Sequence, residues 1–105
     1  MLEICQEGIN RLKGKKYEKF YYDVEKQLAM LQIYDNMVSK SYSLPEIFRN
    51  EISEIIGEDL DDLAEVLWDE DTGINKRLLW EMTTNKLPKL RPYLQNKIDG
   101  QNKSS

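Results

Sequence analysis

The alternation of apolar and polar residues along the chain follows helical spacing and predicts an all-α fold. Apolar residues at intervals of three and four predict a first helix over 2–13, which Gly14 is placed to end. The same period continues over 16–39 and predicts one long helix. Its main apolar face is formed by Tyr17, Tyr21, Val24, Leu28, Leu31 and Val38.

The second half of this long helix carries a second apolar side, which is typical of a helix at the centre of a bundle. That side is formed by Ala29, Met30, Ile33 and Met37. Asp35 interrupts the main face. We expect its carboxylate to bond a tyrosine hydroxyl or to cap a neighbouring helix, and a catalytic aspartate is the alternative.

Two shorter helices are predicted next. Ser43 and Glu46 have the spacing of a capping box, and Gly57 is suited to end the helix that they begin. Asp59 is placed as the N-cap of a following helix that continues to Asp71. Its inner stripe is formed by Leu60, Leu63, Ala64 and Leu67.

The C-terminal part predicts a helix over 74–85 and a short last helix from about Pro92, because prolines restrict the segment between them. Residues 100–105 are polar and predict a flexible tail. The whole pattern predicts a compact bundle of five to six short helices around a central longer helix, with residues 1–99 as a single domain.

Composition narrows the function. The chain has 105 residues, a net charge of −4 and no histidine. The absence of histidine removes the commonest general base and most zinc ligands, so we expect no enzyme, no metal site and no cofactor. A single cysteine, Cys5, excludes an internal disulfide. No apolar run is long enough to span a membrane and no signal-peptide pattern is present, so we expect a cytoplasmic protein.

The most distinctive feature is a one-signed acidic block. From Glu58 to Asp71 there are eight acidic residues in fourteen and no lysine or arginine. They are Glu58, Asp59, Asp61, Asp62, Glu65, Asp69, Glu70 and Asp71. On a helix, one side would pack inward, the other would be a strip of carboxylates, and Trp68 would lie on the border. From Thr72 onward the net charge is +5, so the basic segment could instead fold back and neutralise the block.

In size, acidity, helical pattern and lack of catalytic groups, the chain resembles the small bacterial immunity proteins that are encoded beside colicins or contact-dependent growth-inhibition toxins. The resemblance implies a non-catalytic inhibitor that binds a basic toxin, often a nuclease. A carboxylate-rich face would occupy the place of the substrate phosphates, and Trp68 would supply the buried anchor. The expected partner-binding residues are Asp61, Asp62, Glu65, Trp68, Asp69, Glu70 and Asp71.

Other classes stay open. A phage- or plasmid-encoded inhibitor of a host enzyme would use the same acidic face. A small helix-turn-helix regulator would present Lys76 and Arg77 on a recognition helix over 74–85. Nucleic-acid binding is disfavoured, however, because the chain is acidic overall. A homo-oligomer with both tryptophans at the interface also stays open.

Overall fold

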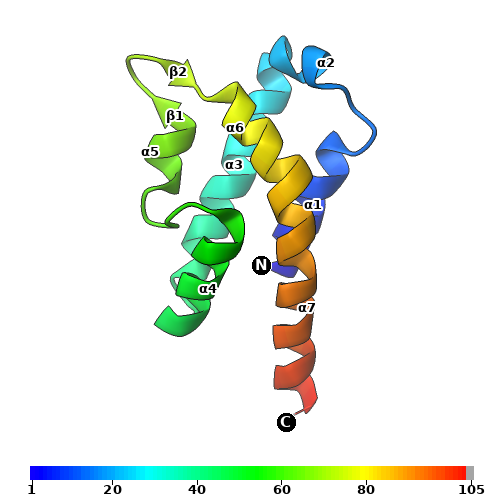
Figure 1. Cartoon of the computed structure of the whole chain (residues 1–105), viewed down its shortest axis with the longest axis vertical. Helices are drawn as coiled ribbons and strands as arrows, with labels where there is room; N and C mark the ends of the chain where they lie inside the picture. The colour runs from blue at the N-terminus through cyan, green and yellow to red at the C-terminus, as the bar shows by residue number, and fades with distance from the viewer. Residues whose placement is uncertain (104–105) are drawn as a thin grey trace.

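The structure, a computed structural model, describes the backbone of residues 1–103 and the side chains of residues 1–97. Within this range the chain is mostly helical, which confirms the predicted all-α class, and it adds one short β-hairpin (Figure 1). The elements are α1 (Leu2–Leu12), α2 (Tyr17–Tyr21), α3 (Val24–Ser41), α4 (Glu46–Ile56), α5 (Leu63–Leu67), β1 (Trp68–Asp69), β2 (Gly73–Ile74), α6 (Lys76–Glu81), the π-helix η1 (Met82–Lys86) and α7 (Leu87–Lys103).

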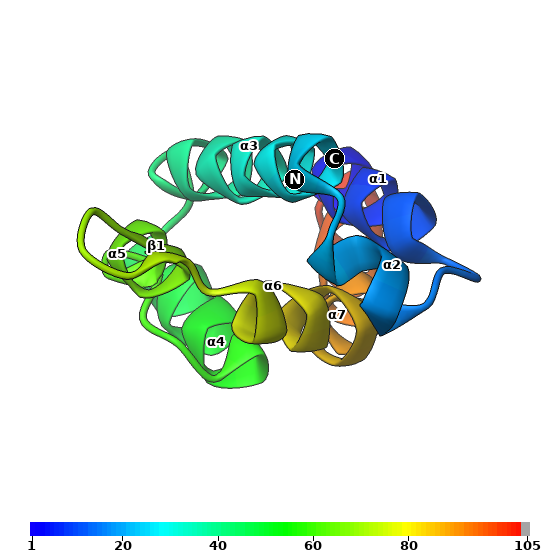
Figure 2. The same ribbon diagram turned by 90° about the horizontal axis from the view of Figure 1, so that it is seen from above.

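The hydrophobic core lies between α3 and α1 on one side and the continuous run α6–η1–α7 on the other. Seen from above, α3 and α1 form one wall of the molecule, and α4, α6 and α7 form the opposite wall (Figure 2). None of the described helices is long and apolar enough to cross a membrane. The fully buried residues include Cys5, Phe20, Met30, Met37, Ile52, Leu63, Leu79, Met82, Leu87 and Leu90.

The prediction of one long helix over 16–39 is wrong at one point. The helix is interrupted at Tyr22 and Asp23, which separate α2 from α3. The side chain of Asp23 accepts a hydrogen bond from the backbone N–H of Lys26 at 3.0 Å and so caps α3. The buried amide of Gln27 donates to the carbonyl oxygens of Phe20 at 2.9 Å and Tyr21 at 2.8 Å. These bonds satisfy the end of α2, and apolar periodicity alone does not reveal them.

The capping box predicted for α4 is not formed. Ser43 Oγ donates to the carbonyl oxygen of Lys40 at 2.7 Å, and Pro45 occupies the N-cap position without a side-chain bond. The serine therefore terminates the preceding helix instead of starting the next one. Gly57 ends α4 in the left-handed region at φ +77°, as predicted.

The helix predicted over 59–71 is also wrong, because only Leu63–Leu67 are helical there. Trp68 pairs with Ile74 in an antiparallel hairpin whose return strand begins at Gly73, with φ +79°. The Asp69 carboxylate accepts the backbone N–H of Asp71 at 2.7 Å and folds the loop. Short acidic side chains favour such local turns over a helix.

The C-terminal third is more continuous than predicted. Helical backbone runs from Lys76 to Lys103, with the π-helix η1 immediately before α7. Thr83 and Thr84 each donate a hydroxyl hydrogen bond at 2.8 Å to a carbonyl oxygen four residues back. The irregular turn lies just ahead of Pro88, where proline removes a backbone donor. Of the predicted tail 100–105, residues 100–103 have helical backbone, and residues 104 and 105 lie outside the described residues.

Candidate binding groove between α3 and α5

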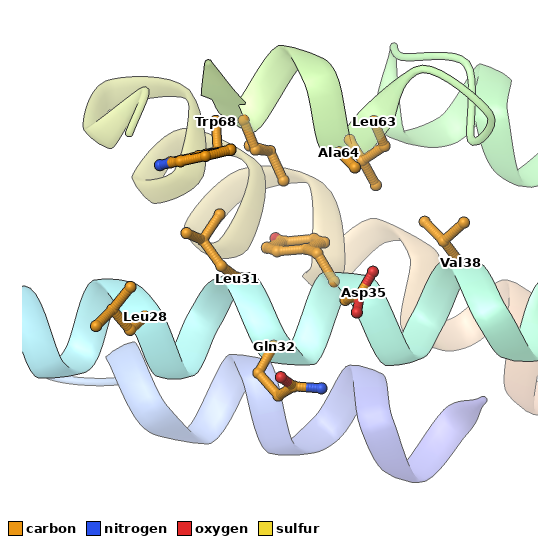
Figure 3. A pocket seen from close by; sticks show the side chains of 10 residues that line it. Leu28, Leu31, Gln32, Asp35, Val38, Leu63, Ala64 and Trp68 are labelled. Carbon is orange, nitrogen blue, oxygen red and sulfur yellow. The ribbon is translucent and has the colours of Figure 1, made fainter. Parts of the chain in front are cut away.

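An apolar groove of about 390 Å³ lies between α3 and the α5–β1 segment (Figure 3). Its sides come from two helices that are far apart in the sequence, and its single charged lining residue is Asp35. The lining residues are Leu28, Leu31, Gln32, Tyr34, Asp35, Val38, Leu63, Ala64, Leu67 and Trp68.

The groove exists because α3 has two apolar faces and the chain covers only one of them. Met30, Ile33 and Met37 are buried, which confirms the second apolar side. Leu28, on the face that was expected to be the main buried one, is 53% exposed. Leu31 and Val38 on that face are only half-buried. The five-residue helix α5 is too short to cover the eighteen-residue α3.

Trp68 forms one end of the groove. Its side chain is 49% exposed and lies above Leu31 in the close view (Figure 3). The hairpin fixes its position, because Trp68 is the first residue of β1, and the N–H of Asn75 donates to the carbonyl oxygen of Leu67 at 2.8 Å. An aromatic side chain held this way costs little conformational entropy when a partner covers it.

Asp35 lies on the α3 side of the groove between Leu31 and Val38. Among the described residues, its carboxylate has no hydrogen bond and no ion pair. The expected bond to a tyrosine is absent: the Tyr34 hydroxyl bonds Thr83 Oγ1 at 2.8 Å instead. The sequence has no histidine that could pair with the Asp35 carboxylate in acid–base chemistry. No cluster of metal ligands occurs in the part of the chain that the structure describes. Nothing in this geometry supports a catalytic role for Asp35.

The seven predicted site residues are all exposed and lie on one unit, residues 61–74, which we call the α5–hairpin unit. Asp61 and Asp62 precede α5, Glu65 lies within it, and Asp69 belongs to β1. Glu70 and Asp71 lie in the hairpin loop. The structure therefore brings the acidic residues together on a turn-rich unit rather than on a helix face. Of the seven, only Trp68 lines the groove.

Asp61 differs from the other acidic residues of this unit because its side chain forms an ion pair and a hydrogen bond within the chain. Its carboxylate accepts Arg49 Nη2 at 2.6 Å and the Tyr42 hydroxyl at 3.2 Å. The hydrogen bond to Asp61, together with its charge, raises the pKa of the Tyr42 hydroxyl. The Arg49 guanidinium lies 4.6 Å from the centre of the Tyr42 ring. Asp61 therefore ties the α5–hairpin unit to α4.

The basic C-terminal segment does not neutralise the acidic unit through any described side chain. Arg77 pairs with Glu81 at 2.9 Å, and Lys97 lies 4.0 Å from Glu51. Lys76 lies 4.2 Å from the centre of the Tyr21 ring. Across residues 1–97, the five remaining acidic side chains of the unit form no ion pair. These five are Asp62, Glu65, Asp69, Glu70 and Asp71.

The helix-turn-helix arrangement is not formed, because the β-hairpin separates α5 from α6. The two tryptophans also differ. Trp80 packs against Tyr17 at 5.7 Å and Phe20 at 5.5 Å between ring centres and is half-buried, whereas Trp68 is exposed. A self-interface that uses both tryptophans is therefore not supported.

Sequence reasoning missed the α3 side of the groove. Helical spacing places Leu28, Leu31, Val38 and Asp35 on the main apolar face of the helix, and such a face is typical of the core. The available signal was Asp35 itself, because an aspartate in the middle of an apolar stripe is unusual for a face that the chain buries.

Comparison with known proteins gives one distant relative. The chain is 27% identical over 95 residues to a protein of Caldanaerobacter subterraneus subsp. tengcongensis named "Putative RNase TTE0752". The match covers 90% of this chain and 85% of that protein. No protein-family model and no solved structure matches the chain.

Proposed function

We propose that this chain is a non-catalytic inhibitor that binds a positively charged partner protein at the α5–hairpin unit and the adjoining groove. The observation that carries the proposal is the combination of five unpaired, exposed carboxylates with an apolar groove and an exposed tryptophan. A bacterial immunity protein that neutralises a basic toxin in the cytoplasm is the biological role that fits this combination.

The two parts of the surface have different tasks in this proposal. Exposed carboxylates attract a basic partner over long range and speed association, because their field is not cancelled by nearby cations. The groove and Trp68 then supply apolar area, which slows dissociation. If the partner is a nuclease, the carboxylates would occupy the positions that substrate phosphates use.

The test is charge reversal at three acidic positions that make no structural bond. Asp62→Lys, Glu65→Lys and Glu70→Lys are combined in one variant, and the protein is used as bait in a lysate of the source organism. We expect the partner captured by the wild type to be lost. The purified partner should also lose its activity when the wild-type chain is added, and keep it when the variant is added.

A matched control reverses three exposed carboxylates elsewhere, by Glu3→Lys, Glu18→Lys and Glu54→Lys. It changes the net charge equally and should keep the partner. Helical circular dichroism confirms that both variants fold. Equal capture by the two variants would show that net charge, or another surface, decides binding.

An RNA-directed activity is the second candidate, and the distant relative named as a putative RNase favours it. The end of the molecule formed by α2 and α6 adds a physical reason. Lys76 lies there beside the Tyr21 ring and Arg77 beside the Tyr17 ring, and Tyr22 is 82% exposed. Cations beside exposed rings suit single-stranded RNA. Cleavage of a labelled single-stranded RNA by the purified chain, abolished in Lys76→Ala/Arg77→Ala, would support this candidate over the inhibitor.

A further inference from the structure

We infer that the α3–α5 groove takes a basic amphipathic α-helix from the partner protein, with one of its lysine or arginine side chains bound to Asp35. The inference rests on the proposed function, since it specifies what that partner presents. The acidic block alone would accept any cationic surface. The groove restricts the choice, because its shape, its polarity and its single charged residue each select against other occupants.

The shape of the groove selects a helix. Except for Trp68, every lining residue belongs to the helices α3 or α5. These walls offer no free sheet edge on which a strand could pair. The stripe from Leu28 to Val38 extends about 15 Å along α3, at 1.5 Å per residue. About three turns of a partner helix would cover it, with apolar side chains at intervals of three and four.

The charge of the groove selects a cation. Covering Asp35 with apolar surface alone would remove an unpaired carboxylate from water, which is costly. A lysine or arginine on the occupant turns this cost into a charge-assisted hydrogen bond. The neighbouring α5–hairpin unit carries five further acidic side chains without an ion pair. Cations on the outer side of the partner helix would therefore also be attracted to this chain.

A second copy of this chain is a poorer occupant. A two-fold dimer through this groove would place the same patch against itself. The Asp35 carboxylates and the two acidic units would then face one another, and like charges brought together oppose association. Dimerisation therefore enters as an outcome of the test.

The probe is a synthetic fourteen-residue peptide with leucine at positions 1, 4, 8 and 11 and lysine at the others. One control peptide has the same composition in an order that spreads the leucines over all faces. Another has glutamate in place of lysine. Binding to the full chain is followed by calorimetry, and backbone amide NMR shifts map the contact. We expect the first peptide to bind most tightly and to shift residues 28–38 and 63–68.

Two variants test the groove. Leu28→Ser removes exposed apolar surface inside it and should weaken binding of the first peptide by about tenfold. Ile47→Ser is the matched control, since Ile47 is a similarly exposed apolar residue on α4, at 62% against 53% for Leu28. It should change binding by less than about twofold. Asp35→Lys should weaken binding by at least about tenfold, and Asp35→Asn by less.

The outcomes separate the inference from the proposed function. Equal effects of Leu28→Ser and Ile47→Ser, or equal binding of the two lysine peptides, would overturn the helix-in-groove inference. If the inference fails in this way but the Asp62/Glu65/Glu70 reversal still loses the partner protein, the proposed function stands. A dimer of the free chain that Leu28→Ser converts to a monomer, measured by light scattering, would identify a second copy as the occupant and also overturn the inference.

Discussion

The two apolar faces of α3 have similar side chains, but one face is buried and the other is partly open to solvent. Met30, Ile33 and Met37 on the inward face are at most 4% exposed. Leu28 on the outward face is 53% exposed, although leucine is at least as apolar as methionine. The comparison shows that hydrophobicity marks a face as able to pack. Whether it packs within the chain depends on the length and position of what lies opposite.

The inward face is covered because α1 and the η1–α7 junction approach it closely. Gly8 of α1 makes this approach feasible: a Cβ added there would lie 2.9 Å from Leu87 Cδ1 and 3.4 Å from Ile33 Cγ2. Within the described residues, the groove on the outward face is lined opposite α3 by α5 and the first residue of β1 alone. Deep burial on one side and a groove on the other follow from this difference.

Truncation on the inward face should give the largest effect. We expect Ile33→Ala to lower the free energy of unfolding by about 2–4 kcal/mol, because it leaves a cavity in a closely packed core. Leu28→Ala, the same kind of change on the outward face, should cost less than about 0.5 kcal/mol. Urea denaturation followed by circular dichroism measures both. Similar losses would mean that the outward face is a second core.

The second largest effect should be a loss of folding stability at alkaline pH, caused by a buried thiol in the core. Burial raises the pKa of the Cys5 thiol from 9.0 to about 11, so the folded chain holds the neutral thiol. The unfolded chain loses this proton first. The contribution of the neutral thiol to the free energy of unfolding is therefore fully present below pH 9. It falls by about 2 kcal/mol between pH 9 and 11.

The control for this pH dependence is the slope of stability against pH, measured by urea denaturation at several pH values. The slope should decrease in Cys5→Ala and stay unchanged in Asp35→Asn on the outward face. An unchanged slope in Cys5→Ala would show that another group titrates.

The hydrogen bond of Tyr34 gives a smaller effect. Tyr34→Phe removes the 2.8 Å bond to Thr83 Oγ1 while keeping the ring, and should cost about 1 kcal/mol. Thr83 retains its own bond to the carbonyl oxygen of Leu79, so the loss stays moderate. Thermal unfolding compares Tyr34→Phe with Thr83→Val, and a double variant should cost less than the sum of the two.

The smallest expected effect has the opposite sign. Asp35→Leu should raise the free energy of unfolding by about 0.5 kcal/mol, because leucine is the better helix former and the aspartate has no partner within the described chain. The same change should weaken binding of the lysine peptide. A variant that is more stable yet binds less well would show that Asp35 serves recognition at the expense of stability. A loss of stability would instead show that Asp35 has a structural task.

The sequence determined the helical class, the presence of two apolar sides on α3, the Gly57 terminator and the run of acidic residues, because each depends on local spacing or local charge. It did not determine the break at Asp23, which requires the bond from Gln27 to the end of α2, or the hairpin, in which Trp68 pairs with Ile74. Only the tertiary structure decided which face of α3 stays open. That outcome depends on how far α5 extends opposite α3, and helical periodicity carries no information about a partner so distant along the chain.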